Sequence, residues 1–140
     1  MKKILINFLI LSLYSLADGE AGSLSLDKEI IEDRKILFPN TKEYLVIISD
    51  LHTHSIFSDG HVWPNIRVEE ALRDGLDVLA ITEHLEYQPH IEFLPNKNRN
   101  DAYKEALQAN KNNEDLLVIN GAEITRIPPA GHMNAIFIQD

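Results

Sequence analysis

From residue 44 onward, short apolar runs alternate along the chain with segments of helical periodicity. Four of these runs predict strands, at residues 44–51 (YLVIISDL), 76–82 (LDVLAIT), 116–120 (LLVIN) and 134–138 (NAIFI). Nearly continuous apolar runs are typical of strands that are covered on both faces. We therefore expect the first two strands to be buried and the third to end at Gly121.

Two of the intervening segments predict helices. Residues 64–75 begin at a proline and end at Gly75, and residues 101–113 follow a favourable capping residue at Asn100 or Asp101. Strands that alternate with helices predict an α/β fold with a parallel sheet and right-handed crossovers. The pattern allows either an open doubly wound sheet or part of a barrel. No glycine-rich phosphate loop follows a strand, which disfavours a nucleotide-binding sheet.

The first 17 residues predict a secretory signal peptide. A basic start and an apolar stretch at residues 4–16 lead to small residues at Ser15 and Ala17, the pattern that precedes cleavage. This mainly apolar stretch of thirteen residues is too short to span a bilayer, which needs ~20. We expect an exported protein, periplasmic or extracellular, with a leader at residues 18–43. The alternative is an ordinary buried N-terminal helix.

Composition narrows the possible partners. The net charge is -9, and loss of the two lysines in the signal peptide would make it -11. An acidic chain is a poor non-specific binder of nucleic acid, which requires a basic face. There is no cysteine, so disulfides and thiolate metal sites are excluded. We expect no membrane partner after signal cleavage.

Potential metal ligands follow the predicted strands. His52 and His54 end the first strand, His84 follows the second, Glu123 follows the third and His132 precedes the fourth. The carboxyl ends of parallel strands meet at one edge of a sheet, where functional sites of α/β folds lie. We therefore expect these side chains to converge.

The spacing of the two histidines after the first strand favours a shared cation. Side chains two residues apart in an extended segment point the same way, so His52 and His54 can reach one ion. Asp59 lies on the following loop, where Gly60 allows a sharp turn, and Asp50 precedes the histidines and could orient one of them. Imidazole and carboxylate ligands suit zinc, manganese or iron.

Several other polar residues have both a functional and an ordinary interpretation. Arg99 and Arg126 are the cations nearest the predicted edge; each could hold a phosphate or form a solvated ion pair. His90 could line the mouth of a pocket, whereas His61 fits a surface loop. Trp63 fits a packing role better than a platform for substrate.

The motifs that carry these residues resemble those of the PHP family, the polymerase and histidinol phosphatase domain. DLHTHSIFSDG resembles its first motif, LAITEH its second, and INGAEIT with the downstream GHMNAIFI its third, together covering residues 44–140. HVWPNIRVEEALRDGLD and EHLEYQPH resemble an exported bacterial subgroup of phosphoesterases that includes phosphodiesterases. The resemblance implies a distorted barrel of seven strand–helix units. It also implies two or three divalent metals (Mn²⁺, Zn²⁺ or Fe²⁺) and a small-molecule phosphoester substrate hydrolysed by metal-activated water.

The resemblance also implies roles for most of the candidate residues. It assigns His52 and His54 to a first metal, Asp59 and His84 to a second, Glu123 to a bridge between metals, and His132 to a third. Glu83 stands where the family usually has aspartate, and there it would support a ligand without binding metal. The resemblance assigns no role to Asp50, His90, Arg99 or Arg126; by position alone, Asp50 could support a ligand and the other three could contact substrate.

One family motif is missing. The family closes its site with a late Asp-x-His motif, and only eight residues follow His132. We therefore expect an N-terminal part of the barrel, with little or no turnover by the 140-residue chain alone. Two alternatives remain open: an amidohydrolase-like enzyme with the same His-x-His motif, and a metal-binding remnant without catalysis.

Overall fold

The computed structural model describes residues 35–139. The predicted signal peptide and most of the predicted leader lie outside the described residues. Residues 35–48 of the leader and of the first apolar run have no regular secondary structure. Among the described residues, no helix is long and apolar enough to cross a membrane.

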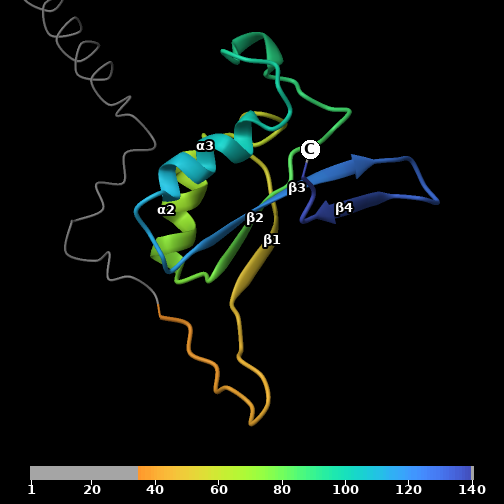
Figure 1. Cartoon of the computed structure of the whole chain (residues 1–140). Helices are drawn as coiled ribbons and strands as arrows, with labels where there is room; N and C mark the ends of the chain where they lie inside the picture. The colour runs from red at the N-terminus through yellow and green to blue at the C-terminus, as the bar shows by residue number, and fades with distance from the viewer. Residues whose placement is uncertain (1–34, 140) are drawn as a thin grey trace, which may run out of the picture. The chain divides into compact units, whose positions relative to one another are not determined.

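Four strands form one sheet in the order β1-β2-β3-β4 (Figure 1). β1 (Ser49–Thr53), β2 (Val78–Ile81) and the first half of β3 (Leu117–Thr125) are parallel neighbours. β4 (His132–Ile136) pairs with the second half of β3 in the antiparallel direction. The predicted α/β architecture with a parallel-rich sheet is confirmed, but the fourth strand is antiparallel where we expected a parallel one.

Both predicted helices are present, α2 (Pro64–Asp74) and α3 (Asp101–Asn110), and a short 3-10 turn, η1 (Ile91–Phe93), precedes α3. α2 begins with proline at its first position, where the missing N–H has no intrahelical partner. It ends at Gly75, whose φ of 72° is left-handed and whose N–H bonds to the carbonyls of Ala71 and Leu72.

The core lies between the sheet and the two helices, which pack against each other (Figure 1). β2 and β3 contribute Leu79, Ile81 and Val118, and the helices contribute small side chains that allow close approach. The buried helical residues of this cluster are Val68, Ala71, Ala102 and Ala106. This packing fixes the central strands, whose carboxyl ends carry the candidate ligands.

Two expectations for the strands are wrong. The first apolar run is not a buried strand: regular pairing starts only at Ser49, and Leu45 is 81 % exposed. Among the described residues β1 is an edge strand, because it pairs with β2 on one side and with no strand on the other. The third strand does not end at Gly121 but continues to Thr125, because β3 exchanges its partner β2 for β4 at that glycine.

Candidate metal centre

Main-chain pairing brings the ends of β2 and β3 together. Beyond β2 the parallel register continues as a bridge between His84 and Glu123. The Glu123 N–H donates to Glu83 O at 3.0 Å, and the Leu85 N–H donates to Glu123 O at 3.0 Å. On the other side of β2, Thr53 of β1 pairs with Ile81. This register brings His52 and His54 to the same edge of the sheet.

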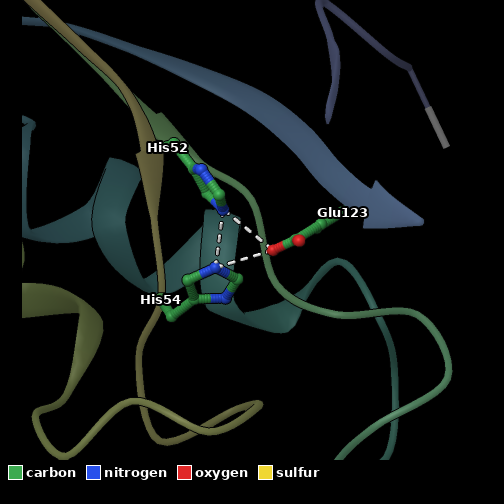
Figure 2. A group of neighbouring side chains, drawn as sticks. All are labelled: His52, His54 and Glu123. Carbon is green, nitrogen blue, oxygen red and sulfur yellow. Dashed lines mark hydrogen bonds and ion pairs between the residues drawn. The ribbon is translucent and has the colours of Figure 1, made fainter. Parts of the chain in front are cut away.

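Three side chains meet at the centre of this edge (Figure 2). His52 Nε2 lies 2.8 Å from Glu123 Oε2, and His54 Nε2 lies 2.9 Å from the same oxygen. The two imidazole nitrogens are 2.9 Å apart. One histidine of the edge strand and one directly after it thus share one oxygen of a carboxylate that is 1 % exposed.

Hydrogen bonds alone cannot satisfy this triangle of atoms. An ionised carboxylate has no proton to donate, and each imidazole nitrogen has at most one. At most two of the three contacts can therefore be hydrogen bonds. A cation removes the conflict, because ligand atoms at bonds of ~2.0–2.2 Å lie about 3 Å from one another. The atoms present therefore fit a divalent metal.

A second group shares His54 and adds His84 and Asp59. The rings of His54 and His84 stack with centroids 4.5 Å apart. Asp59 Oδ2 lies 3.4 Å from His84 Nε2, and its Oδ1 lies 3.6 Å from His54 Nδ1. One atom of each residue lies within 4.8 Å of the others, which is compact enough for a second ion.

A third group joins His84, Glu123 and His132. His132 Nδ1 donates a hydrogen bond to Glu123 Oε1, the carboxylate oxygen that the triangle leaves unused. His84 Nδ1 lies 3.5 Å from Glu123 Oε2, and the rings of His84 and His132 meet edge to face at 5.7 Å. Glu123 thus belongs to two of the three groups and connects them.

Two protonation states suit metal binding. Burial, together with the neighbouring His84, lowers the pKa of His54, so its imidazole is neutral near pH 7. Burial alone would raise the pKa of Glu123, but hydrogen bonds from His52 and His132 outweigh it and the pKa falls. Metal ligands must be neutral imidazoles and ionised carboxylates. The donor set is entirely nitrogen and oxygen, which suits Zn²⁺, Mn²⁺ or Fe²⁺.

The two residues predicted to support ligands lie beside the triangle. Asp50 Oδ1 accepts a hydrogen bond from the backbone N–H of His52 at 3.1 Å, so it holds the main chain and not the imidazole. The Glu83 carboxylate is buried and accepts hydrogen bonds from Ser55 and Ser58 in the β1–α2 loop.

Gly60 closes the same loop by close approach. A Cβ at this position would lie 2.5 Å from His54 O and 2.7 Å from Ser55 Cα. The Gly60 N–H also donates to Ser55 O at 2.9 Å. Any larger residue would therefore displace the segment that carries His54 and Asp59.

The predicted substrate residues lie farther out. Arg126 pairs with Glu86, which also accepts the Thr125 N–H at 3.0 Å; these contacts, with the backbone bond from Thr125 largest, lower the pKa of Glu86. Arg99 is exposed and lines a cavity of about 390 Å³ next to His84. His90 is half-buried and directly precedes η1, whereas His61 is exposed. Neither histidine belongs to the three groups.

Three hydroxyl residues in the site have no place in the sequence prediction. Ser55 and Ser58 contact Glu83, and Thr125 Oγ1 lies 2.8 Å from His84 Nδ1. In the sequence, only their position points to the site. The two serines are the first and last of the four residues between His54 and Asp59, and Thr125 lies two residues after Glu123.

Comparison with known proteins agrees with the motifs. The PHP domain family matches residues 50–138 of this chain. Uncharacterized protein MJ1295 of Methanocaldococcus jannaschii is 36% identical over 80 residues, which cover 57% of this chain and 34% of the relative.

A solved structure extends the likeness to the fold. A two-domain protein from Bacteroides vulgatus, containing a predicted PHP-like metal-dependent phosphoesterase, superposes with a TM-score of 0.72 at 42% identity. The match covers 78% of this chain and 32% of that protein. The chain therefore spans about one third of the length of either relative.

Proposed function

We propose that this chain, which belongs to the PHP domain family, contributes the metal ligands for hydrolysis of a small-molecule phosphoester. One observation carries the proposal: imidazoles and carboxylates from β1, β3, β4 and the loops that follow β1 and β2 converge in three overlapping groups. The solved relative at 42% identity contains a predicted PHP-like metal-dependent phosphoesterase, which supports the same reaction class.

The residues of the site would perform separate tasks. Bound divalent cations, two or three of them, would supply an activated water near neutral pH and offset negative charge on phosphoryl oxygens. Glu123, held ionised by its histidine partners, would keep adjacent cations together. His84 and Asp59 would define the side of the site away from His52. No side-chain nucleophile is required.

The surroundings support a compact anionic substrate. Arg99 lines the cavity that also includes His84, so its guanidinium could contact a phosphate held at the metals. Arg126 is a weaker candidate, because Glu86 already pairs with it. The net charge of -9 disfavours a long nucleic acid, which would meet repulsion beyond the site.

Two alternatives keep the metal groups and change the outcome. An amidohydrolase-like enzyme would use the same His-x-His ligands, but the sequence offers no lysine at a strand end to form a bridging carbamate. A metal-binding protein without catalysis would retain the ligands and lack turnover. The family match favours the phosphoesterase over both.

Metal analysis combined with a substrate panel tests the proposal. The chain is dialysed against Mn²⁺ or Zn²⁺, its metal content is measured, and hydrolysis of bis(p-nitrophenyl) phosphate, p-nitrophenyl phosphate and p-nitroacetanilide is followed. We expect bound metal and at most slow turnover, in keeping with the little or no activity expected of the 140-residue chain. Metal-dependent phosphoester release that is absent in a His52→Ala/His54→Ala variant supports the phosphoesterase. Anilide hydrolysis alone supports the amidohydrolase, and bound metal without any turnover supports the non-catalytic protein. A chain that binds no metal contradicts all three.

A further inference from the structure

A buried carboxylate outside the proposed ligand set organises the β1–α2 loop. Glu83 is 7 % exposed, and its two oxygens collect three donors from two serines. Ser55 donates its backbone N–H to Oε1 at 2.9 Å and its hydroxyl to the same oxygen. The Ser58 hydroxyl contacts Oε2. Both serine side chains are completely buried.

The direction of these hydrogen bonds is fixed by the atoms involved. An ionised carboxylate can only accept hydrogen bonds. Each serine hydroxyl has one proton and therefore donates it to Glu83. Ser55 Oγ is then free to accept, and it does so from the Phe57 N–H at 3.2 Å. Ser58 Oγ is likewise restricted to accepting from any further neighbour.

The further neighbour of Ser58 is a proposed metal ligand. His54 Nδ1 lies 3.2 Å from Ser58 Oγ. Since Ser58 Oγ can only accept there, the proton of neutral His54 belongs on Nδ1. Asp59 Oδ1, 3.6 Å from the same nitrogen, favours the same position. His54 Nε2 is then left with its lone pair, facing His52 and Glu123.

We propose that Ser58, oriented by Glu83, is a positioning residue that holds His54 in its Nδ1–H tautomer and so presents Nε2 to the metal groups. Only the metal-binding consequence of this relay rests on the proposed function; the tautomer itself does not. The relay also accounts for glutamate at position 83, where the family usually has aspartate. The longer Glu83 side chain reaches from beyond the end of β2 to Ser55 and Ser58 of the neighbouring loop.

Two serines of the same loop provide a matched pair for the test. Ser55→Ala and Ser58→Ala each remove one buried hydroxyl from Glu83, but only Ser58 contacts His54. Glu83→Gln is a nearly isosteric second variant: its amide can donate to Ser58 and release that hydroxyl to donate to His54. Thr125→Val removes the hydroxyl beside His84 Nδ1 and serves as a control at the other stacked ring.

Long-range ¹H–¹⁵N correlation spectra of the metal-free chain at about pH 8, where free imidazole is neutral, report the tautomer of each histidine. We expect Nδ1–H for His54 in the wild-type chain and in the Ser55→Ala and Thr125→Val variants. In Ser58→Ala and Glu83→Gln we expect the Nε2–H form to appear, because Nδ1 then loses Ser58 as its acceptor, whereas Glu123 Oε2 remains 2.9 Å from Nε2.

The metal-binding consequence is measured by titration calorimetry with Zn²⁺ and Mn²⁺. Loss of a partner that orients a ligand costs about 10–100-fold in affinity, which we expect for Ser58→Ala and not for Ser55→Ala, whose hydroxyl contacts Glu83 and no proposed ligand. Wild-type His54 in the Nε2–H form overturns the relay without any variant. So does a tautomer that is unchanged in both Ser58→Ala and Glu83→Gln, or one that shifts equally in Ser55→Ala. A wild-type chain with the Nδ1–H tautomer but no metal binding instead contradicts the proposed function.

Discussion

The central and edge strands contribute to the site in different ways. His84, three residues beyond β2, and Glu123, within β3, are 7 % and 1 % exposed and are joined by a main-chain bridge. The side chains of His52 on β1 and His132 on β4 are 50 % and 55 % exposed and are held by contacts with Glu123. Main-chain pairing thus positions both halves of the site, but the central ligands are buried, whereas the edge ligands are exposed and lie on strands with one paired neighbour among the described residues.

This contrast indicates where the free energy of the site is concentrated. The packed helices and central strands position Glu123, and Glu123 in turn positions the two exposed histidines. A defect in the central half should therefore disrupt the whole centre, whereas a defect at either edge should remain local. Four substitutions or conditions, in order of decreasing effect, test that expectation.

The largest effect is expected from the core beneath the central strands. Leu79→Ala deletes a side chain that is 1 % exposed and should lower the free energy of unfolding by about 2–5 kcal/mol, through lost burial and the cavity left behind. Leu45→Ala, at an exposed position before β1, should change it by less than about 0.5 kcal/mol. Urea denaturation measures both, and equal losses would contradict the difference between centre and edge.

The next effect is expected at the carboxylate that connects the groups. Glu123→Gln keeps the size of the side chain but removes the charge that its histidine partners stabilise. We expect affinity for Mn²⁺ or Zn²⁺ to fall about 100-fold or more, beyond the range for residues that only orient ligands. Glu69→Gln on the exposed side of α2 is the matched control and should bind metal as the wild type does. Calorimetric titration gives both affinities.

A smaller effect is expected at each edge strand. His52→Ala and His132→Ala each remove one ligand and leave Glu123 and the bridge to His84 in place. We expect each to weaken metal binding by about 10–100-fold, at least as much as loss of a residue that only orients a ligand and less than Glu123→Gln does. His61→Ala, an exposed histidine outside the three groups, should have no effect on the same titration. If an edge histidine proved more costly than Glu123, the site would not be organised from its centre.

The sequence predicts the helices and the residues of the site better than the sheet pairing. α2 and its stop at Gly75 follow from local signals, because a proline start and a left-handed glycine need no distant partner. Membership of the PHP family, inferred from three motifs, is confirmed by the match to residues 50–138. The burial of β1 is not a local property, since it depends on neighbours on both sides of the strand.

The direction of β4 could have been inferred with a better boundary for β3. Only six residues, 126–131, join the two strands, too few for a parallel crossover of a dozen or more. Ending the third strand at Gly121 concealed this constraint. The contacts of Ser58 and Thr125 could not be predicted, for a different reason. No sequence spacing is typical of a hydroxyl that hydrogen-bonds to a histidine ring, so only the fold shows these contacts.

The smallest effect is expected from pH, through a histidine that both halves of the site contact. The pKa of His54 is lowered from 6.5 in the folded chain by burial and by His84. Between the lowered value and 6.5 the unfolded chain binds more protons, so stability must rise with pH across that window and fall on acidification. Glu123, whose pKa is lowered from 4.5, adds a loss of the same sign at still lower pH.

Urea denaturation of the metal-free chain at about pH 7.5, 6.5 and 5.5, spanning the titration of histidine, measures this dependence. We expect the midpoint to fall toward pH 5.5 in the wild type and in His61→Gln, and to fall less in His54→Gln. The reasoning is that His54→Gln removes the group that must remain neutral when folded, whereas exposed His61 lies outside the three groups. A midpoint that rises on acidification would mean that the imidazoles gain protons on folding, with Glu123 as their counter-ion. The edge histidines, and not His54, would then dominate the electrostatics of the metal-free site.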